Sequence, residues 1–155
     1  MEIFGLPVHP LVVHAVVVLV PLTALVAMAY GLRPGWRWAL RWPMLVLGLV
    51  SAAATQLASM SGESLIEAEE NVSAVLHSHE EWAEKLQLSV WVMAAVIVLA
   101  WWVLPVVTRL VGGTDRAARK PGLVLPTTAL LVIVPIAVLV LVALTGDAGA
   151  RAVWG

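Results

Sequence analysis

Four long apolar stretches dominate the pattern along the chain, and polar segments separate them. They lie near Leu11–Tyr30, Pro43–Met60, Leu86–Val107 and Leu123–Leu144, and none of them contains Asp, Glu, Lys or Arg. Each has the roughly 20 residues that a helix needs to cross a hydrocarbon core of about 30 Å. We therefore predict an all-α membrane protein, in which residues 1–155 form a single domain built as a bundle of four transmembrane helices.

Composition agrees with lipid as the solvent of this chain. Hydrophobic residues make up 61% of it and charged residues 12%, whereas about a quarter of an ordinary soluble domain is charged. Nine Lys and Arg against ten Asp and Glu leave a net charge of −1. The balance gives no sign of a nucleic-acid partner, and the expected partner is the lipid bilayer.

The placement of charge predicts the orientation. The segments 31–42 and 108–122 are basic, while the segment 61–85 carries seven glutamates against one lysine. Because cytoplasmic loops are enriched in Lys and Arg, the two basic segments should be cytoplasmic. Both termini and the acidic segment should then lie on the opposite, outer side.

Helical spacing of apolar residues within the acidic segment, from Leu65 to Leu76, predicts an amphipathic helix over the outer mouth of the bundle. Ser78 to Glu81 fits a capping box, which would start the third helix at His79. The glycine-rich segment Thr145–Gly155 is expected to fold back over the same mouth.

Small residues recur every three or four positions along the second stretch, at Gly48, Ala52, Thr55, Ser59 and Gly62. In lipid, such a face permits close approach of two helix backbones. It predicts packing inside the bundle, and the alternative is the seam of a homo-oligomer.

His14 is the most conspicuous polar residue, because it lies inside an apolar run where ionisable groups are costly and often functional. We expect it to point into the bundle, either as a ligand or proton relay, or as a neutral imidazole satisfied by a neighbouring helix. His9 precedes it by five residues, which on a helix separates the two side chains by about 140°. Each histidine would therefore need a partner from another helix.

His77, His79 and Glu63 should lie on the outer side with His9 and His14. The chain has no cysteine, so imidazoles and carboxylates are the available ligands, and they suit zinc, copper or non-haem iron, or haem b held by two histidines. The candidate cofactor ligands are His9, His14 and His79, and Glu63 is a fourth candidate ligand for a divalent metal. Asp147 and His77 are expected to contact these ligands rather than the cofactor itself. The alternative for His77 and His79 is a pair of exposed imidazoles.

Depth along the helices distinguishes the candidates. At 1.5 Å per residue, His14 lies about 5 Å below the start of its stretch, and His79 about 10 Å above Leu86. His79 should thus pair with His9 rather than with His14. This favours a metal site near the surface over a buried haem.

The segment from Gly5 to His14, with its His-Pro-Leu-x-x-His pattern, resembles the opening of the bacterial membrane family known as domain of unknown function 2231. Ser61-Gly62-Glu63, the histidine at position 79 and the closing motif from Gly146 to Val153 resemble further elements of that family, over essentially the whole chain. The resemblance implies a four-helix domain of a bacterial cytoplasmic membrane, fused in other proteins to Rieske or cytochrome c domains. Many members have a histidine where this chain has Asp147.

Two functions follow as hypotheses. The first is a redox-associated module that binds haem b or a divalent metal and works with a respiratory or other redox partner protein. The second is a non-catalytic structural or assembly subunit of a membrane complex. The sequence favours a protein without catalytic activity of its own, because no nucleophile and base can be picked out, and a transporter ranks third because no charge lies at mid-membrane.

Overall fold

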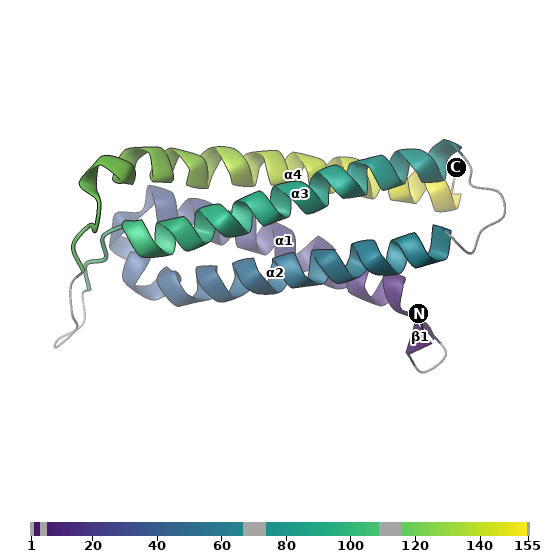
Figure 1. Cartoon of the computed structure of the whole chain (residues 1–155), viewed down its shortest axis with the longest axis horizontal. Coiled ribbons are helices and arrows are strands. Elements are labelled where there is room, and N and C mark those ends of the chain that lie inside the picture. Colours follow the sequence, from purple (N-terminus) through teal and green to yellow (C-terminus); the bar gives the residue numbers. More distant parts are fainter. Residues whose placement is uncertain (1, 4–5, 67–73, 109–115, 155) are drawn as a thin grey trace.

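The computed structural model describes the chain except for residues 1, 4–5, 67–73, 109–115 and 155, and it consists almost entirely of four long helices (Figure 1). The helices are α1 (Val8–Leu32), α2 (Arg37–Ile66), α3 (Ala74–Val103) and α4 (Val124–Trp154). Two short strands, β1 (Glu2–Ile3) and β2 (Leu6–Pro7), pair in an antiparallel manner before α1. All four helices are long and apolar enough to cross a membrane. The predicted all-α bundle is confirmed.

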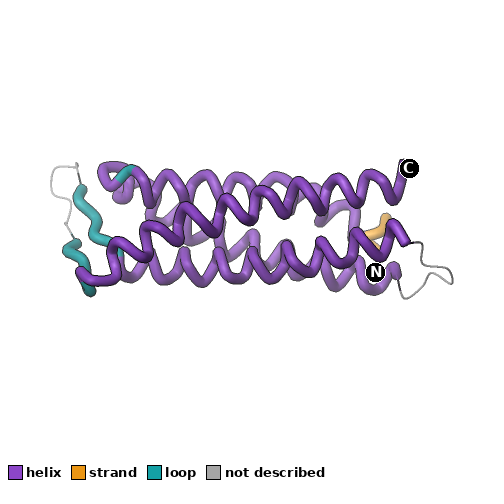
Figure 2. Tube along the Cα trace, turned by 90° about the horizontal axis from the view of Figure 1, so that it is seen from above, coloured by secondary structure: helices purple, strands orange, loops and turns teal. Residues whose placement is uncertain are grey.

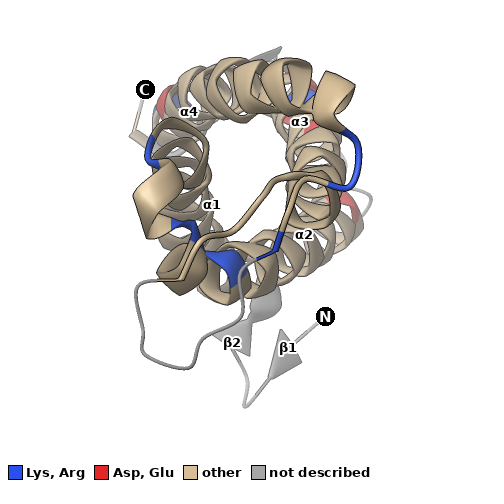
Figure 3. Cartoon of the chain, turned by 90° about the vertical axis from the view of Figure 1, so that its left-hand side faces the viewer, with Lys and Arg blue, Asp and Glu red and all other residues tan. Residues whose placement is uncertain are grey.

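The helices stand side by side in a ring, seen from the side in Figure 2 and along the bundle in Figure 3. α1 packs against α2 and α4, and α3 packs against the same two helices. Both termini lie at one end, which we call the termini end, together with the end of α2 and the start of α3 (Figure 1). The opposite end carries most of the arginines, and we call it the arginine end.

Small and medium apolar side chains fill the interior where the helices meet. The small-residue face of α2 is part of this packing: Gly48, Ala52 and Thr55 are buried, and a methyl group on Gly48 would come within 2.9 Å of Ile97 Cδ1. Close approach of α2 and α3 explains why small residues stand there. The face predicted for packing therefore serves the bundle itself.

The two helical hairpins repeat one design. Short 3-10 helices, η1 (Pro34–Trp36) and η2 (Pro121–Leu123), precede α2 and α4, and each begins with Pro-Gly after a basic residue. Six buried residues of α1 have the same spacing as six buried residues of α3. These residues are Val16, Val20, Thr23, Ala24, Ala27 and Tyr30 in α1, and Leu86, Val90, Met93, Ala94, Ile97 and Ala100 in α3. The bundle is thus a tandem of two similar units, the kind of internal repeat that places sites at the interface of its halves.

Three local predictions were wrong. α3 begins at Ala74 rather than His79, so the Ser78–Glu81 capping box lies within the helix. α3 also ends at Val103, before the predicted Val107 and two residues before Pro105. Proline removes a helical N–H and disfavours helix at the residue before it. The closing segment does not fold back, since α4 continues as helix to Trp154.

The predicted amphipathic helix over the mouth falls partly on residues 67–73, which lie outside the described part of the chain. Its flanks belong to the long helices, because Ile66 ends α2 and Ala74 starts α3.

At the arginine end, arginine side chains cap the ends of α1 and α3, because prolines leave carbonyl groups there without a helical N–H. Residue 34 is a proline, so the Tyr30 carbonyl has no helical N–H four residues on, and Arg37 Nε donates to that oxygen at 3.1 Å. Pro105 likewise has no N–H to donate to the Trp101 carbonyl, and Arg116 Nη1 donates to that oxygen at 3.1 Å. Each hairpin thus uses one arginine to replace the N–H that a proline lacks.

Candidate functional site

His9 lies at the start of α1 on its inward side, half-buried against the end of α2. Its Nδ1 lies 3.0 Å from the carbonyl oxygen of Ala58 and 3.2 Å from the Ser61 hydroxyl, which itself donates to Ala58. A methyl group on Gly62 would come within 2.9 Å of His9 Cε1. The glycine therefore lets the imidazole lie directly against α2, one turn beyond the carbonyl that holds it.

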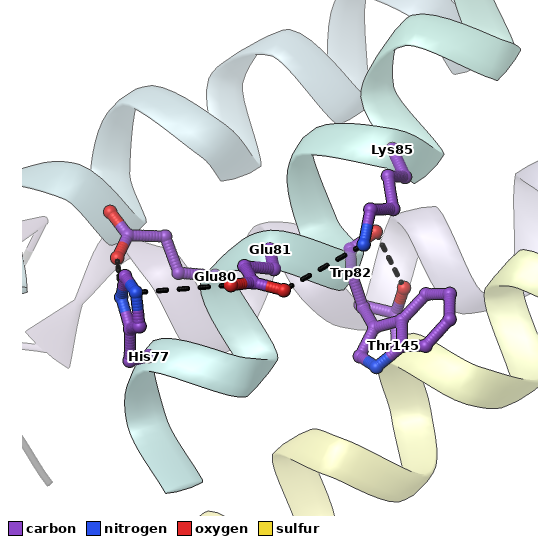
Figure 4. A network of polar contacts seen from close by, with 6 residues as sticks. All are labelled: His77, Glu80, Glu81, Trp82, Lys85 and Thr145. Carbon is purple, nitrogen blue, oxygen red and sulfur yellow. Dashed lines mark hydrogen bonds and ion pairs between the residues drawn. The ribbon is translucent and has the colours of Figure 1, made fainter. Parts of the chain in front are cut away.

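His79 repeats this arrangement between α3 and α4. Its Nδ1 lies 3.1 Å from the carbonyl oxygen of Thr145, and a methyl group on Gly149 would come within 3.0 Å of its Cε1. The Thr145 hydroxyl donates back to the Trp82 carbonyl at 3.1 Å, which ties the two helices a second time (Figure 4). In both hairpins, a histidine of the first helix bonds to a carbonyl of the second helix and packs against the glycine four residues after that carbonyl.

The hydrogen bonds fix the tautomer of both rings. A carbonyl oxygen can only accept, so each Nδ1 must carry the proton. In the neutral imidazole the lone pair then belongs to Nε2. Among the described residues, no hydrogen bond engages Nε2 of His9 or of His79. Both rings are thus held through Nδ1, and the basic Nε2 of each makes no hydrogen bond with a described residue.

His9 and His79 occupy corresponding places in the two hairpins, on the inward faces of α1 and α3, which stand across the ring from each other (Figure 3). The structure therefore places both histidines at the termini end, each bonded to the second helix of its own hairpin.

His14 does not join them. Its side chain is exposed on the outside of the bundle, and its Nδ1 donates to the Pro10 carbonyl of its own helix. The expectation that His14 points into the bundle is wrong. His9 takes the inward face of α1, and a residue about 140° further round that helix must point away.

The other candidates are also on the surface. His77 Nδ1 lies 3.3 Å from Glu80 Oε2, and its Nε2 lies 3.9 Å from Glu81 Oε1 (Figure 4). Asp147 pairs with Arg151 along α4, with 2.9 Å between Oδ2 and Nε. Their carboxylates and imidazole are engaged with neighbours on the same helix rather than with His9 or His79.

Glu63 is exposed near the end of α2, and its Oε1 lies 3.2 Å from the Ser59 hydroxyl. Over the described residues, no three His, Asp or Glu side chains come together in a way that could hold a metal ion. The predicted metal centre of His9, His14, His79 and Glu63 is therefore not assembled. Its members stand on different faces of α1, α2 and α3, and His9 and His79 are bonded to the neighbouring helices α2 and α4.

The sequence reasoning missed the residues that hold the two histidines. Ala58 and Thr145 act through their carbonyl oxygens, which no side-chain pattern reveals, and Gly149 acts by having no side chain. A signal was present, because glycines end both hairpins and Pro-Gly starts the second helix of each. An internal comparison of the two halves of the chain would have aligned His9 with His79.

Comparison with known families supports the membrane assignment. A family model described as Predicted membrane protein (DUF2231) matches residues 5–155. No curated protein and no solved structure matches the chain. The resemblance drawn from the His-Pro-Leu-x-x-His opening is confirmed.

Proposed function

The chain belongs to the predicted membrane protein family DUF2231, and from that premise we propose that it is a membrane module that binds haem b through His9 and His79, in association with a redox partner protein. The observation that carries the proposal is the pair of Nδ1-anchored imidazoles at the termini end. Bound haem would supply one-electron chemistry, and His9 and His79 would hold it.

The hydrogen bonding supports this use of the histidines. Histidines that bind metals almost always donate their second N–H to a carbonyl, a carboxylate or water, which fixes the ring and raises its basicity. His9 and His79 both do so through backbone carbonyls.

The internal repeat favours haem over a lone metal ion. Two equivalent histidines from two similar hairpins offer one ligand from each side, which is what a planar cofactor with two axial positions takes. A zinc or non-haem iron site needs three or more protein ligands, and the described residues offer no third one.

Absorbance spectroscopy of the purified protein tests the proposal. The wild type, isolated in detergent from bacteria supplied with a haem precursor, is expected to show a Soret band that shifts on reduction. His9→Ala and His79→Ala should each reduce the bound haem at least tenfold, since each removes one axial ligand.

His14→Ala and His77→Ala are the matched controls, because both remove an exposed histidine near the same end, and both should retain the full Soret band. Absence of haem from the folded wild type, or an equal loss in the controls, would contradict the proposal. Metal analysis of the same samples distinguishes haem iron from a metal bound without colour.

A second candidate is the structural or assembly subunit, and one observation favours it. His9 and His79 each join two helices by a hydrogen bond, so they stabilise the bundle whether or not a cofactor binds. In that case the wild type carries neither haem nor metal, yet His9→Ala and His79→Ala still unfold more readily than His14→Ala.

We further propose that the arginine end faces the cytoplasm of a bacterium and that both termini face outward. The basic side chains described at the arginine end support this orientation. The chain has no cysteine, so Ala117→Cys and Ala150→Cys each introduce a single thiol at an exposed position at opposite ends. A membrane-impermeant maleimide added to spheroplasts is expected to label position 150 at once and position 117 only after permeabilisation. The reverse order would overturn the orientation.

A further inference from the structure

Three buried donors at the arginine end have no acceptor. Tyr30 Oη, Arg41 Nε and Trp101 Nε1 are all buried, and none makes a hydrogen bond with any described residue. Tyr30 is completely buried. Buried polar groups are nearly always hydrogen-bonded, because leaving one unpaired destabilises the folded protein. Three such groups at one end of a bundle call for a ligand that accepts hydrogen bonds.

The three donors are close neighbours from three helices. The Arg41 guanidinium carbon lies 4.2 Å from the centre of the Trp101 ring, and that of Arg116 lies 5.6 Å from the same centre. The Arg37 guanidinium carbon lies 5.7 Å from the centre of the Tyr30 ring. Tyrosine, tryptophan and arginine side chains thus converge on one place under the connections between the helices.

Among the described residues, the charge around these donors is positive, and no carboxylate pairs with it. Arg37 is buried, with only 4% of its surface exposed, and the basic side chains described at this end make no ion pair with a carboxylate. They are Arg33, Arg37, Arg41, Arg116, Arg119 and Lys120 (blue in Figure 3). Buried charges are costly unless an opposite charge pairs with them, so the missing acceptor should be an anion.

We infer that the arginine end binds a phosphate oxyanion among Tyr30, Arg41, Trp101 and Arg116. A phosphate has several acceptor oxygens and a full negative charge, and arginine binds it with strong, charge-assisted hydrogen bonds. The phenol and indole N–H groups can donate to the remaining oxygens. The phosphate belongs either to an anionic lipid headgroup or to a soluble ion.

The surrounding tryptophans favour the lipid as the source. Four of them are exposed at this end: Trp36, Trp38, Trp42 and Trp102. Tryptophans gather at the level of the lipid headgroups, and basic pockets between helices on the cytoplasmic side bind such headgroups. The oxyanion site therefore lies at the depth where lipid phosphates are found.

The test measures lipid and phosphate binding to the full chain. The protein is placed in nanodiscs of phosphatidylcholine with or without phosphatidylglycerol, and Trp fluorescence and lipids retained in native mass spectrometry are recorded. The wild type should retain phosphatidylglycerol selectively. Arg41→Gln should weaken this binding about tenfold and Tyr30→Phe about threefold, since each removes donors to the phosphate.

Arg119→Gln is the matched control, because it removes the same charge from an exposed side chain at the same end, and binding should change less than twofold. Circular dichroism of each variant verifies that it is folded. Competition by inorganic phosphate would show that the site also takes the soluble ion, and lack of competition would assign it to the lipid. Lipid retention that Arg41→Gln and Tyr30→Phe leave unchanged, or an equal loss in Arg119→Gln, would overturn the inference.

Discussion

Gly149→Ala is expected to destabilise the bundle by about 1–2 kcal/mol, although alanine is the better helix former. The new methyl group would lie 3.0 Å from His79 Cε1 and 3.1 Å from its Nδ1, so the imidazole must move and its hydrogen bond to Thr145 is lost. Loss of a buried hydrogen bond costs about 1–3 kcal/mol, while replacing a helical glycine by alanine returns about 0.5–1 kcal/mol. The measurement is the free energy of unfolding in mixed micelles with increasing sodium dodecyl sulfate.

Gly146→Ala is the control for this change, because it lies in the same helix and a methyl group there meets nothing within 4 Å. It should stabilise the protein by about 0.5–1 kcal/mol. In a His79→Ala background the clash is absent, and Gly149→Ala should then behave like Gly146→Ala. If Gly149→Ala stabilises the otherwise unchanged chain, the contact between His79 and α4 does not form as described.

Arg37→Met is expected to have the larger effect, about 2–4 kcal/mol of lost stability. The guanidinium donates to the carbonyls of Tyr30, Gly31 and Pro105, with donor–acceptor distances of 3.1, 3.2 and 3.4 Å. Pro34 cannot supply the helical N–H to Tyr30, so methionine would leave buried acceptors unpaired, at about 1–3 kcal/mol for a single group. Unfolding in the same mixed micelles measures the loss.

Arg33→Met serves as the reference, since Arg33 is exposed and its guanidinium lies 6.0 Å from the centre of the Trp36 ring. Such a surface change should alter the stability by no more than about 0.5 kcal/mol. Arg37→Lys keeps the charge but loses the forked donors, and it should fall between the two. Equal stability of Arg37→Met and Arg33→Met would show that Arg37 is not the group that closes α1.

The sequence indicated at which end of the bundle the candidate site lies, but not which histidines form it. Counting residues along the helices placed His9, His14, His77 and His79 at one end, and the depth argument paired His79 with His9. The structure holds His9 and His79 against neighbouring helices at this end and leaves His14 exposed. The ligand role of any of them stays a prediction.

The four membrane helices could be predicted from the sequence alone, because a stretch of about 20 uncharged apolar residues has the length and composition of a membrane span. The sequence also determined the unequal charge of the two ends. It could not determine how each helix is rotated about its axis. α1 and α4 are apolar on all sides, and in lipid the face toward a neighbouring helix is as apolar as the face toward the bilayer.

The packing of the helices sets which side of α1 turns inward, and so places His9 against α2 and leaves His14 exposed. Gly62 leaves room on α2 for the His9 imidazole, and Gly149 leaves room on α4 for that of His79. The same holds at the other end, where prolines remove helical donors and Arg37 and Arg116 replace them from elsewhere in the chain. Such contacts depend on packing geometry rather than on hydropathy, and that is why the sequence pattern could not reveal them.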